Sequence, residues 1–210
     1  MRAVPPRITL YRRFGKAMLD RGVAVMLLVV LSPLMLAVAA AALLFNGRPI
    51  LFRQTRPGLD EQPFELLKFR TMTDGRGPDG VRLPDGERLT SFGRWLRRTS
   101  LDELPQLVNV LRGELSLVGP RPLLLEYLPR YSPQQRRRHQ VKPGITGLAQ
   151  VSGRNALDWA TRLKLDVEYV ERYSLGVDLR IMARTLLKVV TGEGVADGRT
   201  PTSEPFTGQR

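Results

Sequence analysis

The sequence predicts an α/β membrane-attached protein with short strands, several helices and one apolar N-terminal segment. The apolar segment is a run of about 24 uncharged residues, 22–45, which exceeds the ~20 that a bilayer-spanning helix needs. Two short stretches with strand-like alternation follow, at 50–54 and 64–72. Two helices are expected near the end of the chain, at 156–173 and 178–190.

The composition narrows the classes of function. The chain has 210 residues, no cysteine and a single histidine, His139. Disulfides and thiol chemistry are therefore excluded, and neither a Ser-His-Asp hydrolase nor a His-rich zinc site is expected. The net charge of +13 predicts an anionic partner, for which nucleic acid, anionic lipid and phosphorylated substrates all qualify.

The charge is concentrated around the apolar run. Residues 1–56 carry nine Lys and Arg against one acid, Asp20. Asp20 and Arg21 stand at the entrance of the run, either as an interfacial ion pair or as two solvated charges. We expect three parts: a basic flank with the membrane segment (1–57), a globular domain (58–191) and a loosely ordered tail (192–210).

Ser32-Pro33 lies near the middle of the apolar run. Proline removes an intrahelical hydrogen bond and clashes with the preceding turn, so a kink is expected there. Basic residues also flank both ends, whereas a crossing helix carries its cations mainly on the cytoplasmic side. A re-entrant helix-break-helix that returns to its own face satisfies both observations, and a kinked crossing helix remains the alternative.

Two predicted strands, a loop and a helix follow the apolar run. Lys68 and Arg70 share one face of the second strand at period two. Residues 73–88 are rich in Gly, Asp, Pro and Arg and predict a mobile surface loop that could cover a site. Residues 92–98 predict a helix with Phe92, Trp95 and Leu96 facing inward.

Two adjacent carboxylates, Asp102 and Glu103, follow this helix. Ser100 with Glu103 fits a capping box, so one interpretation is a purely structural helix cap with no catalytic role. A cap at Asp102 is the other register, because it places Pro105 in the first turn and turns the Asp102 carboxylate towards free N–H groups that would keep it ionised. In either register the helix ends near Arg112, before Gly113.

The remaining motifs are turns and basic helix faces. Arg121 lies between two prolines that fix its backbone. Ser132-Pro133 predicts an N-cap, and the basic run 136–139 predicts a solvated or membrane-facing surface. The glycine turns at 142–147 and 151–155 match neither a P-loop nor a dinucleotide-binding turn. The expected helix at 178–190 places Leu179, Met182, Leu186 and Val190 on one face and Arg180, Arg184 and Lys188 on another. This pattern is typical of an amphipathic helix at a membrane surface, and equally of a core helix with solvated cations.

In this order the motifs resemble one family. They are the Ser32-Pro33 break, Lys68-Phe69-Arg70-Thr71-Met72, Ser100-Leu101-Asp102-Glu103, Val118-Gly119-Pro120-Arg121-Pro122 and Pro143-Gly144-Ile145-Thr146-Gly147. The chain resembles the bacterial monotopic phosphoglycosyl transferases, or bacterial sugar transferases. The closest likeness is to the small members that initiate N-linked glycan assembly.

The resemblance implies a reaction and its place. A sugar 1-phosphate, expected to be N-acetylated, would pass from a UDP-sugar to undecaprenyl phosphate with release of UMP. The mechanism would be ping-pong, through a covalent phosphosugar on an aspartate, with Mg²⁺ neutralising the diphosphate. The enzyme would sit in the bacterial inner membrane, contacting its lipids through the re-entrant helix, with a cytoplasmic catalytic domain and no nucleic-acid partner.

The resemblance also implies roles for seven residues. Asp102 would be the nucleophile and Glu103 its dyad partner, and either carboxylate could ligate the metal. Arg121 and Arg97 would bind phosphate. Lys68, Arg70 and Asp166 match family segments and are expected to line the site.

Two alternatives remain. The same chemistry could prime O-antigen, capsule or exopolysaccharide synthesis with another sugar. From a different class, a basic membrane-attached adaptor or nucleic-acid-binding module would explain the charge, but it leaves Asp102 and Glu103 without a role, and the chain lacks clusters of aromatic residues for base stacking.

Overall fold

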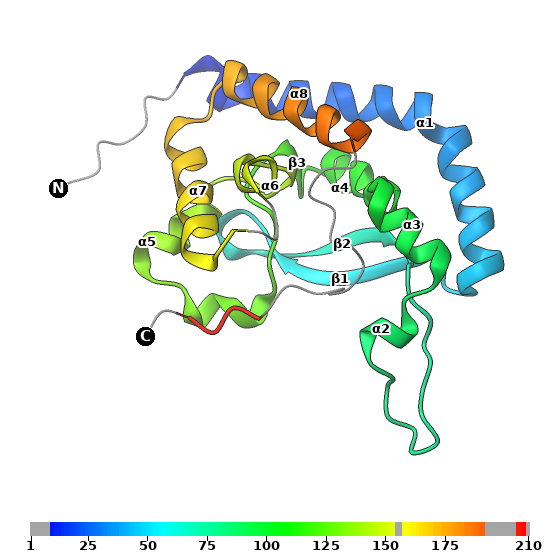
Figure 1. Cartoon of the computed structure of the whole chain (residues 1–210). Helices are drawn as coiled ribbons and strands as arrows, with labels where there is room; N and C mark the ends of the chain where they lie inside the picture. The colour runs from blue at the N-terminus through cyan, green and yellow to red at the C-terminus, as the bar shows by residue number, and fades with distance from the viewer. Residues whose placement is uncertain (1–8, 154–156, 192–204, 209–210) are drawn as a thin grey trace.

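The computed structural model describes residues 9–153, 157–191 and 205–208 (Figure 1). Most of the expected tail, and part of the glycine turn at 151–155, lie outside these ranges. The helices are α1 (Lys16–Asn46), α2 (Asp85–Arg88), α3 (Ser91–Thr99), α4 (Gln106–Arg112), α5 (Pro133–Arg136), α6 (Leu148–Ser152), α7 (Trp159–Arg172) and α8 (Leu175–Thr191). The strands are β1 (Leu51–Pro57), β2 (Pro63–Phe69), β3 (Ser116–Val118) and β4 (Gly144–Thr146).

The apolar segment forms α1, which follows a short π-helical stretch, Tyr11–Gly15. Pro33 lies inside the helix, and the Ser32 hydroxyl donates to the Val29 carbonyl at 2.8 Å. Figure 1 shows α1 changing direction midway, so that its second half descends along one side of the molecule. The expected kink is therefore confirmed. Among the described residues, Tyr11–Asn46 is the one helix long and apolar enough to cross a membrane; the re-entrant topology stays a prediction.

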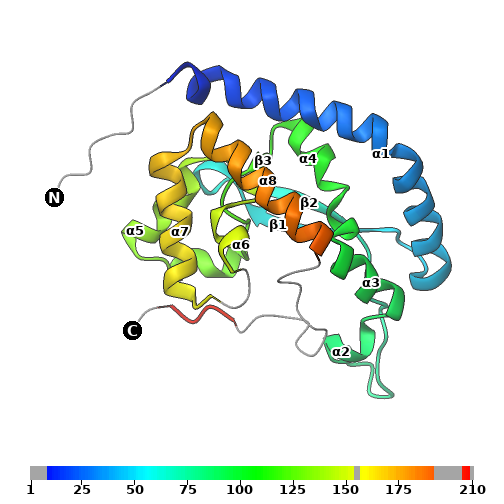
Figure 2. The same ribbon diagram turned by 45° about the horizontal axis from the view of Figure 1, so that its top comes forward.

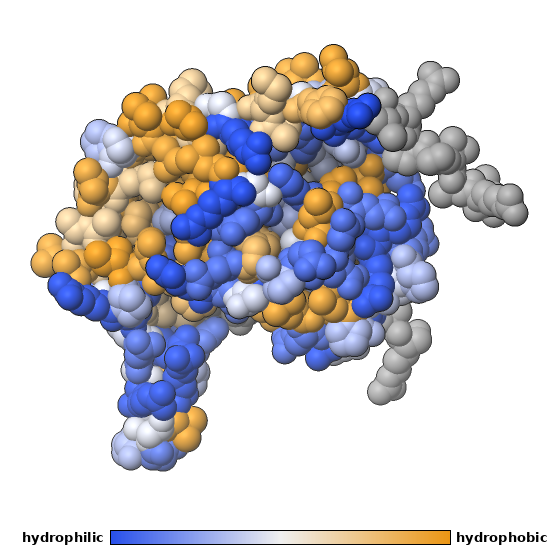
Figure 3. All heavy atoms as spheres, turned by 180° about the vertical axis from the view of Figure 1, so that it is seen from behind, coloured by the Kyte–Doolittle hydropathy of each residue, from blue (hydrophilic) through white to orange (hydrophobic). Residues whose placement is uncertain are grey.

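Much of α1 carries apolar side chains that the protein does not cover. Met18, Val29, Leu36 and Leu44 are each more than two-thirds exposed. Seen from behind, apolar side chains gather on the side that α1 forms, whereas the arm below is hydrophilic (Figure 3). An apolar surface of this kind suits contact with lipid tails rather than with water.

Both predictions for Asp20 are wrong. It is not a solvated charge, because it is 6 % exposed, and it pairs with Lys16 rather than with Arg21. Its carboxylate accepts a hydrogen bond from the Ser116 hydroxyl at 2.6 Å and lies 3.8 Å from the Lys16 ammonium. The same ammonium contacts Asp178 of α8 at 2.6 Å. The first turns of α1 are thus fastened to β3 and α8 by buried polar groups.

The two predicted strands are confirmed as an antiparallel hairpin, β1 and β2, in which Phe52 lies opposite Lys68. A second, parallel pair joins β3 to β4. Helix α4 packs on both α1 and β2. The central core draws on α1, β2, α4, β3, α7 and α8, with Ala24, Leu66, Leu107, Val110, Leu115, Val118, Tyr169 and Ile181 buried together.

The segment between β2 and α3 is an arm that extends away from the rest of the molecule in both views (Figures 1 and 2). A bridge between Arg76 and Arg82 pairs its two sides, and α2 ends it. Helix α3 follows as predicted, with Leu96 fully buried. Trp95 was wrongly placed inward: its side chain is 43 % exposed, and its ring stacks on that of Phe92.

The C-terminal helices form near the predicted positions. Ser132 and Gln135 make a reciprocal capping box with Pro133 at the first turn, which confirms the predicted N-cap. The prediction for the basic run is wrong for Arg138 and His139, which are 2 % and 6 % exposed, because the run enters the core between α5 and α7. In the described part of the tail, Phe206 is buried against Tyr127, Tyr131 and Trp159.

Helix α8 sits on the domain through Asp178 and Ile181, both nearly inaccessible. Leu179 and Leu186 of the predicted apolar face are 51 % and 68 % exposed, while Met182 packs partly against the core. Arg180 and Arg184 are exposed as well. Its apolar face is thus largely uncovered, which favours an amphipathic surface helix over a core helix.

Candidate active site

The two carboxylates lie on a 3-10 turn, Leu101–Glu103, between α3 and α4. Ser100 ends α3 in the left-handed conformation, with φ 58° and ψ 16°. A residue in this conformation cannot act as an extended N-cap, and its side chain makes no capping bond. Helix α4 begins instead after Pro105, so the predicted caps at Ser100 and Asp102 are both wrong. The predicted helix end is confirmed, with Gly113 at φ 78°.

Glu103 is held by two cations from different elements. Its Oε1 lies 2.7 Å from the Lys68 ammonium of β2 and 2.6 Å from Nη2 of Arg121. Burial alone would raise the pKa of Glu103, but the charges and hydrogen bonds of Arg121 and Lys68 outweigh it and hold the pKa far below its usual range. Glu103 is therefore a fixed negative charge that locates both cations.

Asp102 occupies a different environment although it is adjacent to Glu103 in the sequence. It is 6 % exposed, and its Oδ2 lies 3.9 Å from the Lys68 ammonium. Burial and then repulsion from Glu103 raise its pKa to about 6, against the opposing pull of Lys68, Arg121 and Arg97. With a cap at Asp102, the sequence predicts that helix N–H groups keep this carboxylate ionised. In the structure the neighbouring cations favour the ionised form instead, but they do not bring the pKa of Asp102 back to its usual value.

Arg97 approaches the carboxylates from α3. Its Nε donates to the Thr71 hydroxyl at 3.1 Å. Burial lowers the pKa of Arg97 and the charge of Asp102 raises it, so the two groups are close enough to interact. Four of the predicted residues besides Asp102 thus gather at one place: Glu103, Lys68, Arg97 and Arg121.

Arg70 lies elsewhere, because β2 ends at Phe69 and the period-two face ends with it. Its guanidinium donates to the carbonyls of Met72, at 2.7 Å, and of Arg48, and pairs with Asp74 at 2.7 Å. These contacts tie the end of the hairpin to the base of the arm. They do not include the carboxylate pair.

Asp166 faces the interior of the protein. It is 2 % exposed and pairs with Arg138 at 2.7 Å. Arg138 in turn donates to the main-chain carbonyl of Arg121 at 2.6 Å, so it lies next to the site. Sequence reasoning missed Arg138 by treating the basic run as a surface. The signal was Asp166 itself, because an acid amid the apolar residues of a buried helix requires a cation.

The two predicted metal ligands suit Mg²⁺ in kind but are few. Mg²⁺ prefers carboxylate oxygens and commonly takes one or two of them together with substrate phosphates. Asp102 and Glu103 provide such oxygens, although both oxygens of Glu103 already accept hydrogen bonds from Arg121. No group of three or more acidic or histidine side chains fit to hold a metal occurs within residues 9–153, 157–191 and 205–208.

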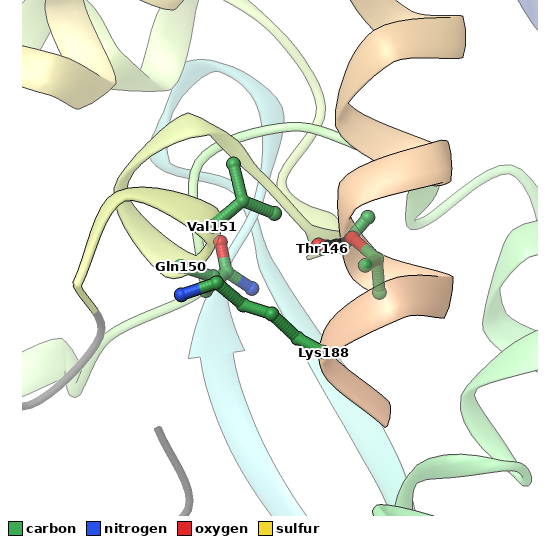
Figure 4. Close-up of a pocket in the computed structure, with 5 residues that line it drawn as sticks. Thr146, Gln150, Val151 and Lys188 are labelled. Carbon is green, nitrogen blue, oxygen red and sulfur yellow. Dashed lines mark hydrogen bonds between the residues drawn. The ribbon is translucent and has the colours of Figure 1, made fainter. Parts of the chain in front are cut away.

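A shallow pocket that is not part of the carboxylate site lies between β4, α6 and α8 (Figure 4). Lys188 of α8 extends across it towards Gln150 of α6, whose Oε1 is buried without a hydrogen-bond partner in the described structure. Thr146 and Thr185 bond to each other at its wall, at 2.7 Å. Its lining contains none of the predicted site residues.

Comparison with known proteins shows the family to which the chain belongs. The family model described as bacterial sugar transferase matches residues 11–192. The chain is 52 % identical over 193 residues to an uncharacterized sugar transferase, EpsL, of Bacillus subtilis, covering 92 % of this chain and 96 % of that protein. It is 43 % identical over 196 residues to a UDP-glucose:undecaprenyl-phosphate glucose-1-phosphate transferase of Caulobacter vibrioides, covering 89 % and 73 %.

A third relative has another sugar in its name. The galactosyl transferase CpsE of Streptococcus agalactiae is 40 % identical over 163 residues, which are 71 % of this chain and 36 % of that protein. The match to the family model spans the bent helix, the carboxylate pair and the cations around it. On these grounds the chain belongs to the bacterial sugar transferase family, and it is a phosphoglycosyl transferase.

Proposed function

We propose that this enzyme transfers a sugar 1-phosphate from a UDP-sugar to undecaprenyl phosphate, through a covalent phosphosugar on Asp102. The observation that carries the proposal is the unequal carboxylate pair. Glu103 is neutralised by Lys68 and Arg121, whereas Asp102 has no such close ion pair and a pKa near 6. At neutral pH Asp102 is mostly a carboxylate, the form that a nucleophile requires.

The cations supply binding for a diphosphate. The Arg121 side chain is 43 % exposed, so part of its planar set of donors is open to a ligand. Lys68 and Arg97 add further positive charge near Asp102. Asp102 and Glu103 would hold Mg²⁺, which when bound supplies charge neutralisation for the diphosphate.

Each half-reaction forms one bond and breaks one. In the first, an Asp102 oxygen attacks the β-phosphorus of the UDP-sugar, and the bridging P–O bond breaks as UMP departs with its oxygen. In the second, a phosphate oxygen of undecaprenyl phosphate attacks the same phosphorus. The bond to Asp102 then breaks, giving undecaprenyl-diphospho-sugar and the free carboxylate. The division replaces one displacement between two phosphates by two steps through a positioned nucleophile.

The polyprenyl acceptor accounts for the membrane segment. Undecaprenyl phosphate holds its charge at the headgroup level, while the exposed apolar side of α1 suits the lipid below. We propose that the domain faces the cytoplasm of a bacterium from its inner membrane, where UDP-sugars and the acceptor phosphate meet.

The sugar distinguishes the two forms of the proposal. The resemblance predicted an N-acetylated sugar. Of the relatives described above, one has glucose and one has galactose in its name, which favours the alternative of a hexose. UMP release measured across UDP-glucose, UDP-galactose and N-acetylated donors, with undecaprenyl phosphate present, decides between them. The highest kcat/KM identifies the donor.

Intact-mass analysis without acceptor tests the mechanism. With Mg²⁺ and the preferred UDP-sugar, the wild-type protein should gain the mass of one sugar phosphate, and Asp102→Asn should gain none. Glu65→Gln serves as control, because Glu65 is a half-exposed acid whose pairing with Arg53 lies away from the site. An adduct that persists in Asp102→Asn would remove Asp102 as the nucleophile.

A further inference from the structure

Arg138 and Asp166 form an ion pair that is almost entirely removed from water. They are 2 % exposed each, and Nη2 and Nε of Arg138 lie 2.7 and 3.1 Å from the same oxygen, Oδ2 of Asp166. Such a pair adds little net stability, because the loss of hydration offsets the attraction between the charges. Its presence therefore calls for a role beyond stability.

The second contact of Arg138 indicates that role. Nη2, the nitrogen that contacts Asp166, also donates to the main-chain carbonyl of Arg121 at 2.6 Å. The planar guanidinium fixes these directions relative to one another, which an ammonium cannot do. The orientation of the Arg121 peptide is thus set by a side chain that is itself held by a buried carboxylate.

The turn around Arg121 depends on donors from outside it. Pro120 and Pro122 have no N–H to offer. The carbonyl of Pro120 accepts from the Gly144 N–H at 3.0 Å, and Gly119 donates to the Thr146 carbonyl at 2.8 Å. These bonds fix the turn to β4, and Arg138 connects it to Asp166 of α7. The Arg121 side chain can then meet Glu103 at 2.6 Å.

We propose that Arg138 is a positioning residue for the transfer reaction, acting through the Arg121 carbonyl, with Asp166 holding Arg138 in place. The inference deepens the proposed function, on which it rests, by assigning a role to two buried residues that do not face the carboxylate pair. It replaces the expectation that Asp166 lines the site. A displacement of about 1 Å in a clamp of this kind costs on the order of 100-fold in rate.

A double-mutant cycle separates positioning from simple support of the fold. Arg138→Lys keeps a positive charge for Asp166 but loses the fixed fork to Arg121. Arg138→Met with Asp166→Leu removes the pair without leaving a buried charge. We expect each to lower kcat/KM for the UDP-sugar by about 100-fold in otherwise wild-type protein. In an Arg121→Ala background, we expect each to lower it less than about two-fold, because the guanidinium that the Arg138 contact positions is gone.

The control removes a surface ion pair from α7, the helix that carries Asp166. Glu168 and Arg172 of α7 pair at 3.0 Å on the surface, with side chains 38 % and 74 % exposed. Glu168→Gln with Arg172→Gln should leave kcat/KM within two-fold of wild type. Thermal unfolding of every variant shows which have folded. If the apolar double variant does not fold, the cycle is measured with Arg138→Lys alone.

A second readout keeps this inference apart from the proposed function. The same cycle is measured on the Kd for UDP with Mg²⁺, which requires no turnover. Losses that vanish in the Arg121→Ala background, in kcat/KM or in Kd, support positioning. Equal losses with and without Arg121, or wild-type values in Arg138→Lys, overturn it. Absence of UMP release from wild-type protein with every donor would overturn the proposed function alone.

Discussion

Asp102 is a residue whose environment works against its charged form. Its pKa of about 6 in the folded protein lies above the ~3.9 of an unfolded aspartate, so folding favours the protonated form. The stability that this adds is present below about pH 4 and is lost as the pH rises through 6. The ionised nucleophile is therefore a destabilised residue at the pH where the enzyme operates.

Replacing that charge should stabilise the protein. We expect Asp102→Asn to raise the free energy of unfolding at pH 8 by up to about 3 kcal/mol, and the gain to shrink towards pH 4. Glu103→Gln is the matched contrast, since the pKa of Glu103 is lowered and its loss leaves Lys68 and Arg121 without their partner. That variant should be less stable than wild type at pH 8. Urea unfolding of both at the two pH values measures the effect; an Asp102→Asn variant less stable at pH 8 contradicts it.

The same pKa predicts how adduct formation depends on pH. Only ionised Asp102 attacks, so the rate of the first half-reaction should rise about ten-fold per pH unit below 6 and level off above 7. Rapid quenching followed by intact-mass analysis, with UDP-sugar and Mg²⁺ but no acceptor, measures this rate. Circular dichroism at each pH controls for unfolding. A rate already constant from pH 4.5 upwards would show that Asp102 titrates at its ordinary value.

At the scale of elements, the placement of α3 depends on one glycine. A Cβ at Gly93 would stand 1.9 Å from the Thr71 carbonyl oxygen, which is main chain and has little freedom to move. Thr71 also receives the hydrogen bond from Arg97, so displacing α3 displaces an arginine of the site. The close approach of this helix to the end of the hairpin is thus a condition for the cation cluster.

Gly93→Ala should therefore impair both stability and activity. We expect a loss of about 1–3 kcal/mol in the free energy of unfolding, as for other overpacked sites, and a fall in kcat/KM at least ten-fold. Gly86→Ala is the control, because a Cβ there would meet no atom within 4 Å. Thermal melts and UMP release measure the two effects. If Gly93→Ala behaves like Gly86→Ala, α3 has more freedom than its contacts imply.

The elements that could be predicted are those whose signals are local. The period of two located β1 and β2, Ser132-Pro133 located the start of α5, and Gly113 located the end of α4. The turn before α4 could not be predicted in this way. Ser100 and Asp102 carry good capping side chains, but the end of α3 forces Ser100 into a left-handed conformation that excludes the cap.

At the scale of the whole molecule, the missed features are contacts between distant parts of the chain. Ser116 lies 96 residues from Asp20, and Asp166 lies 28 residues from Arg138. No local period indicates such partners, so Asp20 and Arg138 were assigned to surfaces. Family motifs mark the carboxylate pair and the cations Lys68, Arg97 and Arg121, which the structure brings together. The same motifs predict that Arg70 and Asp166 line the site, but a motif does not say where a side chain points.

The bent α1 bears on how the enzyme meets the membrane. A straight helix of 31 residues would be about 46 Å long, well beyond the ~30 Å hydrocarbon core. The apolar stretches before and after Pro33 are each shorter than the ~20 residues that a crossing needs. Arg13 and Arg53 lie beyond opposite ends of the apolar run, and a re-entrant helix keeps both charges in the same aqueous phase, whereas a crossing helix separates them.

Labelling of single cysteines tests this topology cleanly, because the natural chain has none. We expect Arg13→Cys and Arg53→Cys to react with a membrane-impermeant maleimide from the same side of inverted vesicles. Leu36→Cys is the control for depth: Leu36 is 72 % exposed in the protein, so only lipid should protect it from the reagent. Reaction of Arg13→Cys and Arg53→Cys from opposite sides would establish a crossing helix. The acceptor phosphate would then have to reach Asp102 without the bent anchor holding the domain against the headgroups.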